Sequence, residues 1–93
     1  MTDPSTQTAA HWHADPDVLV TDLGDELVLL HSRTSQMYSL NAVARTAWQA
    51  LPATTPALLA AVLATYDVPA GQARTDLDAL LTDLVRLDML RQA

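Results

Sequence analysis

The hydrophobic periodicity of this chain changes at Asn41, and this change limits the possible folds more than any other feature. Residues 36–40 alternate with a period of two, which is typical of a half-buried β-strand. After Asn41, apolar residues recur at the i, i+3, i+4 and i+7 positions of a helix, namely Ala44, Ala47, Trp48 and Leu51. Because asparagine is a favoured helix N-cap, we expect the strand to pass directly into the helix here.

Two further apolar runs precede this junction, at residues 18–20 and 27–30. Gly24 and Asp25 lie between them and are a turn signal, and the polar residues 32–35 separate the second run from residues 36–40. Three strands joined by such short turns predict an antiparallel β-meander. A sheet of this size is not stable alone in water and needs other elements packed on one face.

Helical patterns fill the rest of the chain and can cover this sheet. The helix after Asn41 is expected to stop before Pro52. Thr55 is expected to cap a second helix with Pro56 at its first position, and a third helix is expected from about Gln72 to Met89. Strands followed by helices predict an α+β domain, and a three-stranded meander followed by three helices suggests a winged helix-turn-helix-like arrangement.

The chain of 93 residues is long enough for one small domain and not for two. Residues 1–15 are mostly polar and lack periodicity, so we expect a disordered N-terminal tail, with the domain in residues 16–93. No apolar run approaches the roughly 20 residues that span a bilayer. The polar start also lacks a secretory signal, so we expect a cytoplasmic protein.

Charge and residue content exclude several kinds of site. The chain has 11 acidic residues against 5 basic ones, which argues against nucleic-acid and anionic membrane partners because both need a cationic surface. It has no cysteine, and His11 and His13 lack a third ligand at metal-binding spacing. His31 ends an apolar strand and is expected to pack at an edge or contact solvent. We therefore expect no catalytic residue, metal or cofactor, and no enzyme.

Residues 36–40 lie at an edge of the predicted meander, because the run at 27–30 occupies its centre. An edge strand presents unpaired backbone groups, and this one has neither charge nor proline to block pairing. A peptide could add to it as a further strand, using the backbone of Gln36, Met37, Tyr38, Ser39 and Leu40. Parity puts Tyr38 and Leu40 on one face, which we expect to be the face toward the helices. Alternatively, the tail or a second copy of the chain covers this edge.

Residues 18–91 resemble the PqqD-like family, also called RiPP recognition elements, which act on ribosomally made precursor peptides. The resemblance is carried by Tyr38, the Leu40-Asn41 pair and Trp48 in the strand-to-helix junction. The strand at residues 27–31 and the segments 63–69 and 76–90 fit the family's pattern in the same order. The chain departs from this pattern at Ser35, where the family often has glycine, and at Asp88-Met89, where Gly-Leu is usual.

The resemblance implies a non-catalytic protein that binds the leader segment of a precursor peptide. The leader would pair with residues 36–40 and lie in a groove against the third helix. The opposite wall of that groove would come from the third helix, with Leu77, Leu80, Leu81 and Leu84 as candidates for the pocket or the core, and Asp76 and Asp83 as candidates for the polar rim. The domain would deliver the peptide to a modifying enzyme such as a radical SAM protein, a leader protease or a cyclase.

Two other classes of function remain open. A winged-helix transcription regulator is one, although the third helix carries more acidic than basic residues. The other is a small interaction domain that forms a homodimer through the edge at residues 36–40.

Overall fold

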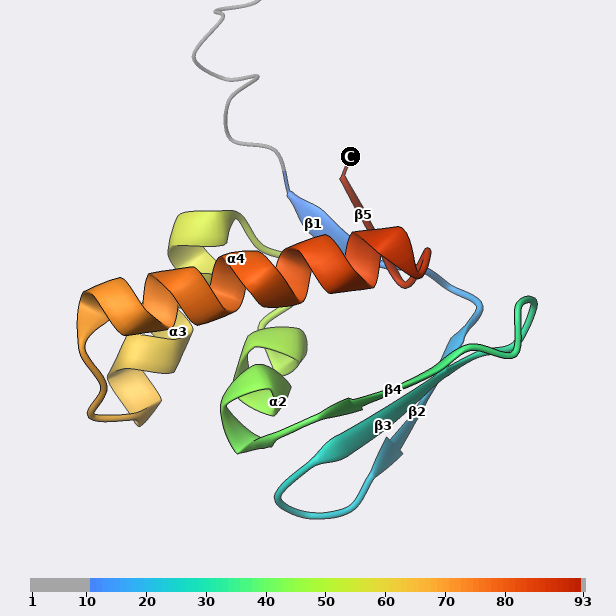
Figure 1. Ribbon diagram of the computed structural model, residues 1–93, viewed down its shortest axis with the longest axis horizontal. Coiled ribbons are helices and arrows are strands. Elements are labelled where there is room, and N and C mark those ends of the chain that lie inside the picture. Colours follow the sequence, from blue (N-terminus) through green and yellow to red (C-terminus); the bar gives the residue numbers. More distant parts are fainter. Residues whose placement is uncertain (1–10, 93) are drawn as a thin grey trace, which may run out of the picture.

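The computed structural model describes residues 11–92 and reveals an α+β fold (Figure 1). Its elements run in the order β1 (Trp12–Ala14), β2 (Val18–Asp22), β3 (Leu27–His31), β4 (Met37–Leu40), α2 (Ala42–Gln49), α3 (Thr55–Thr65), α4 (Ala70–Arg86) and β5 (Leu90–Gln92). The predicted α+β class, a three-stranded antiparallel meander followed by three helices, is confirmed.

The meander has the order β2-β3-β4, with both pairings antiparallel, so β4 is an edge strand as expected. Burial alternates along β3, where Leu27 and Leu29 face the helices and Val28 and Leu30 lie on the opposite face. His31 continues the buried set and is 0% exposed, so the expectation of an edge or solvent contact is wrong. Its parity with Leu27 and Leu29 explains this, because residues two apart share a face.

Local capping explains where the helices begin. The side chain of Asn41 accepts a hydrogen bond from the Ala44 amide, as the sequence predicted for α2. The cap of α3 is Thr54 and not Thr55, because the Thr54 hydroxyl accepts the bond from the Ala57 amide.

The third helix also differs from its predicted range, since α4 begins at Ala70 rather than Gln72 and ends at Arg86 rather than Met89. Asp88 has a left-handed backbone, with φ of 59°. The amides of Asp88 and Met89 return to the carbonyls of Val85 and Leu84, which is a Schellman motif. This motif ends the helix and directs the chain into β5.

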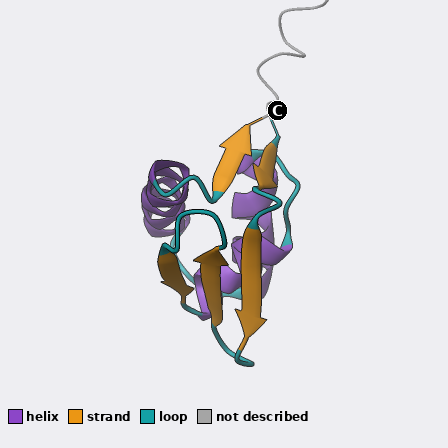
Figure 2. Ribbon diagram, turned by 90° about the vertical axis from the view of Figure 1, so that its right-hand side faces the viewer, coloured by secondary structure: helices purple, strands orange, loops and turns teal. Residues whose placement is uncertain are grey.

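A second sheet consists of β1 and β5, which pair antiparallel near the two ends of the described chain (Figure 2). Trp12 belongs to β1, and its indole Nε1 donates to the Thr55 hydroxyl at 2.9 Å. The prediction that the tail extends to residue 15 is therefore wrong for Trp12–Ala14. Residues 1–10 lie outside the described part of the chain.

The core lies between the meander and the helices. Its fully buried side chains come from both layers and from the segment after α4: Leu27, Leu29, His31, Leu40, Leu58, Leu84 and Met89. Figure 2 shows the helices on one side of the meander, which leaves its other face open. Within residues 11–92, no helix is long and apolar enough to cross a membrane.

Candidate functional site

The edge strand β4 has two residues whose backbone groups face away from the sheet. The amide of His31 donates to the carbonyl of Gln36 at 2.8 Å, which makes these two residues a hydrogen-bonded pair. In an antiparallel ladder such pairs alternate with non-bonded ones, so Tyr38 and Leu40 also bond to β3. The N–H and C=O groups of Met37 and Ser39 therefore point outward along the free edge.

The side chains of β4 divide between the two faces as the sequence predicted. Leu40 is buried in the core and Tyr38 is half-buried on the helix side. Met37, at 64% exposure, and Ser39 lie on the open face, while Gln36 is exposed just before the strand. The free edge thus lies next to a helix-facing side that is partly apolar.

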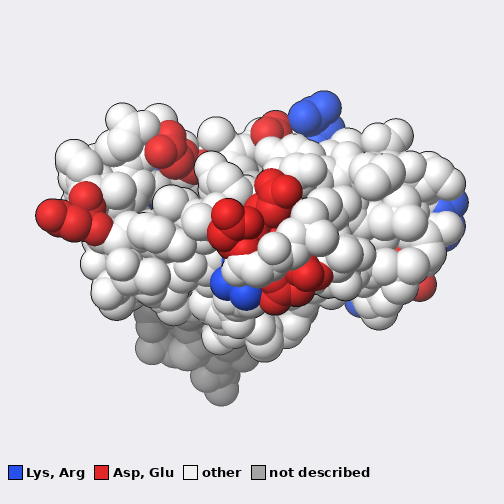
Figure 3. All heavy atoms as spheres, turned by 90° about the horizontal axis from the view of Figure 1, so that it is seen from below, with Lys and Arg blue, Asp and Glu red and all other residues white. Residues whose placement is uncertain are grey.

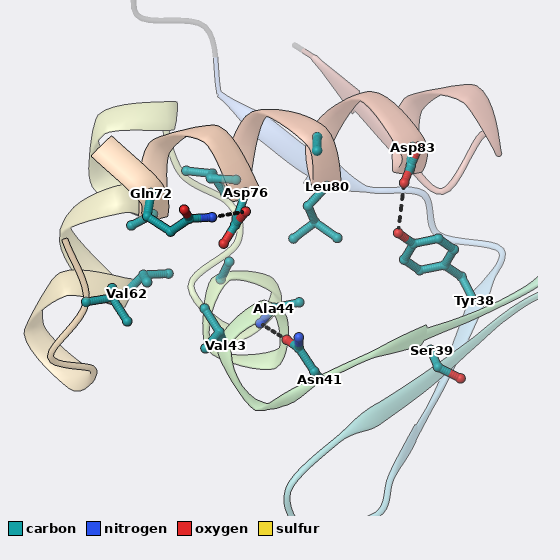
Figure 4. Close-up of a pocket in the computed structure, with 15 residues that line it drawn as sticks. Tyr38, Ser39, Asn41, Val43, Ala44, Val62, Gln72, Asp76, Leu80 and Asp83 are labelled. Carbon is teal, nitrogen blue, oxygen red and sulfur yellow. Dashed lines mark hydrogen bonds between the residues drawn. The ribbon is translucent and has the colours of Figure 1, made fainter. Parts of the chain in front are cut away.

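A cavity of about 320 Å³ lies between β4 and the helices (Figure 4). Its walls are mostly apolar and come from α2, α3, α4 and the loop before α4: Val43, Ala44, Ala47, Val62, Val68, Ala73, Leu77, Ala79 and Leu80. Its polar lining consists of Tyr38, Ser39, Asn41, Gln72, Asp76 and Asp83. A mostly apolar cavity with a few polar groups is typical of a ligand site.

One hydrogen bond connects the strand to α4 at the end of this cavity. The Tyr38 hydroxyl donates to an Asp83 carboxylate oxygen at 3.0 Å (Figure 4). Burial, and then the bond to Asp83, raise the pKa of Tyr38, which keeps the phenol protonated and able to donate. Arg86 Nη2 also donates to Asp83, at 3.1 Å, and this bond, followed by that from Tyr38, lowers the pKa of Asp83.

The structure separates the four leucines that were candidates for the groove wall or the core. Leu77 and Leu80 line the cavity, and Leu80 is the more accessible of the two. Leu81 and Leu84 are buried and do not line it. Both rim candidates, Asp76 and Asp83, do line the cavity, and Asp76 accepts a bond from Gln72 Nε2 at 2.8 Å.

Several lining residues were not predicted as site residues. Asn41, Val43 and Ala44 come from the start of α2, and Gln72 comes from the first turn of α4. Ala44 was recognised only as part of the apolar stripe of its helix. The small side chains at Ala44 and Ala47 were the available signal, because small residues leave space where larger ones would fill it.

Among the described residues, no group of three or more His, Asp or Glu side chains is arranged to hold a metal ion.

Comparisons with known proteins identify the family of this chain. The family model described as coenzyme PQQ synthesis protein D (PqqD) matches residues 26–90. The chain belongs to the PqqD family. No curated protein matches it.

Two solved structures are similar to this PqqD-family chain. TbiB1 in complex with the TbiA(beta) leader peptide is 27% identical, with a TM-score of 0.77 over 85% of this chain and 94% of that one. A lasso peptide synthetase B1 complexed with the leader peptide is 24% identical, with a TM-score of 0.73 over 86% of this chain and 96% of that one. The second likeness concerns the fold alone.

Both departures from the PqqD-like glycine pattern fall on left-handed residues. Ser35 has φ of 63° and Asp88 has φ of 59°, a region that favours glycine because it has no Cβ. The chain thus adopts at both positions a backbone conformation that glycine favours, and a residue with a Cβ is strained there. At Ser35 this turn leads directly into β4, and the Ser35 amide donates to the His31 carbonyl at 2.8 Å.

Proposed function

We propose that this protein binds the leader segment of a ribosomally made precursor peptide as an added strand on β4. The observation that carries the proposal is the outward-facing backbone of Met37 and Ser39 beside the apolar cavity. The leader would pair with this edge and direct alternate side chains toward α4. Membership of the PqqD family and the likeness to TbiB1, which was solved with a leader peptide, support this function.

The binding energy would come from two sources. Met37 and Ser39 offer two N–H and two C=O groups, and each hydrogen bond contributes about 1 kcal/mol net. The resulting ~4 kcal/mol is comparable with the 2–5 kcal/mol that ordering a flexible peptide costs. Burial of apolar leader side chains in the cavity, at about 25 cal/mol per Å², supplies the remaining affinity. Backbone pairing would fix the register, and the cavity would select the sequence.

The protein would perform no chemistry on the peptide. It would present the leader to a modifying enzyme, which is a radical SAM protein, a leader protease or a cyclase. The proposed site would contact the peptide through the β4 backbone, apolar walls and a few polar side chains, none of which is arranged as a nucleophile with a base.

A DNA-reading role is not favoured by the charge of the surface. Arg74 is paired with Asp78 and Arg86 with Asp83, so both basic residues of α4 have acidic partners. The face of the molecule drawn in Figure 3 shows scattered acidic groups and no extended basic patch. The phosphate backbone of DNA would therefore meet little unpaired positive charge on α4 or on the face drawn in Figure 3.

NMR titration with a synthetic leader tests the proposal. Candidate leaders are the N-terminal segments of short open reading frames next to this protein's gene. We expect the amides of Met37 and Ser39 to shift and to become protected from hydrogen exchange, because they acquire acceptors. Changes confined to β2, the other edge of the sheet, would refute the proposed site. Sedimentation tests the alternative of a homodimer through β4. That alternative predicts that the free protein is a dimer and that added leader does not dissociate it.

A further inference from the structure

The cavity beside β4 carries negative charge without a balancing positive group in its lining. Its fifteen lining residues include Asp76 and Asp83 and neither arginine nor lysine. Asp83 is partly neutralised, since it accepts from Arg86 as well as from Tyr38. Asp76 accepts only from the neutral amide of Gln72, at 2.8 Å, and forms no ion pair within residues 11–92.

The neighbouring aspartate of the same helix shows the contrast. Asp78 pairs with Arg74 at 3.2 Å, lies on another side of α4 and does not line the cavity. Asp76 is therefore the acidic residue of α4 that lines the cavity and forms no ion pair with an arginine of residues 11–92. A carboxylate at the mouth of an apolar cavity attracts a cationic ligand group and repels an acidic one.

The spacing along α4 indicates where such a group would stand in a bound strand. Asp76 and Leu80 are four residues apart, which is about 6 Å along a helix axis. Two residues of a β-strand cover about 6.6 Å, and residues two apart point to the same face. Figure 4 shows Asp83 beside Tyr38 of β4, with Leu80 and then Asp76 further along α4 and lining the same cavity, so a strand added at the β4 edge can place alternate side chains against Leu80 and Asp76.

We infer that the bound peptide carries lysine or arginine two positions from an apolar residue, and that Asp76 selects this cation while Leu80 contacts the apolar side chain. This inference rests on the proposed function. It assigns to Asp76 a preference between peptides, which backbone pairing alone cannot supply because every peptide offers the same backbone groups.

Selection from a phage-displayed library of random dodecapeptides tests the inference without knowledge of the natural precursor. We expect enrichment of Lys or Arg two positions from an apolar residue on the wild-type protein, and loss of that cation preference on Asp76→Asn. Asp78→Asn is the matched control, because it removes the same charge from the same helix outside the cavity. It should select the wild-type pattern.

A selected peptide is then synthesised with its cation intact and with the cation replaced by glutamine. For the wild-type protein and for Asp78→Asn, the replacement should weaken binding about fivefold, and added salt should reduce the difference. For Asp76→Asn it should have no effect.

The outcomes separate this inference from the proposed function. Selected peptides that shift the Met37 and Ser39 amides but share no cation would overturn the role of Asp76 and leave strand addition standing. Equal cation preference in Asp76→Asn and wild type would do the same. Failure to select any peptide that perturbs these amides would overturn both.

Discussion

Ser39→Pro tests whether the β4 edge receives a peptide strand. The substitution removes the outward N–H of Ser39 but none of the bonds that β4 makes with β3, and proline is tolerated at such edge positions. One lost hydrogen bond costs about 1 kcal/mol, and a peptide carbonyl left buried without a donor adds at least about 1 kcal/mol more. The sum of ~2 kcal/mol corresponds to about thirtyfold weaker binding of the leader.

Isothermal titration calorimetry with the synthetic leader measures this change, and circular dichroism checks that the variant is folded. Val20→Pro is the matched control. Val20 is 47% exposed on the outer edge of β2, and its backbone also faces away from β3, because the Ser32 amide bonds the Asp17 carbonyl and sets the same alternation. This variant should bind normally. Unchanged affinity in folded Ser39→Pro, or equal weakening in Val20→Pro, would refute strand addition at β4.

Three further outcomes follow from the structure. Leu80→Asp should weaken leader binding about tenfold by calorimetry while the fold is kept, whereas Val85→Asp, on a 43% exposed residue of α4 outside the cavity, should bind normally; equal effects would contradict the assigned wall. Asp88→Gly should stabilise the protein by about 1 kcal/mol and raise the melting temperature by roughly 4–8 °C, since its φ is positive; no rise would contradict strain there. The lowered pKa of Asp83 means that its stabilisation is present above its ordinary value of 3.8 and is lost as pH falls through the lowered value. Urea unfolding at pH 7 and at pH 3 should therefore show a larger acid loss in wild type than in Asp83→Asn, and equal losses would contradict the coupling.

The meander and the three helices could be predicted because each element has a recognisable pattern in its own short stretch of sequence. The period of two in residues 36–40, the cap at Asn41 and the apolar spacing after it are all visible within about ten residues. The edge position of β4 followed from strand order alone. Side-chain parity then correctly placed Tyr38 and Leu40 toward the helices.

The elements that were missed depend on contacts between distant parts of the chain. Strands β1 and β5 have three residues each, which is too short for a period, and Trp12 pairs with Gln92 at the other end of the described chain. His31 carries a polar side chain, so its burial follows from strand parity and not from its residue type. The separation of Leu80 from Leu81 and Leu84 depends on how α4 is rotated over the core, which helical spacing does not specify.

The helix α4 serves both the core and the cavity, and this limits where peptide preference can change. One stripe of the helix is buried in the core: Ala73, Leu77, Leu81 and Leu84. The adjacent stripe borders the cavity: Gln72, Asp76, Leu80 and Asp83. Leu77 belongs to both, so Leu77→Ala would remove cavity wall and also about 2–5 kcal/mol of stability, a large part of what a small domain has. Asp76 is exposed and Leu80 is only partly buried against the core, so we expect changes there to cost less stability, and we expect selectivity among peptides to reside at these two positions rather than at the buried leucines.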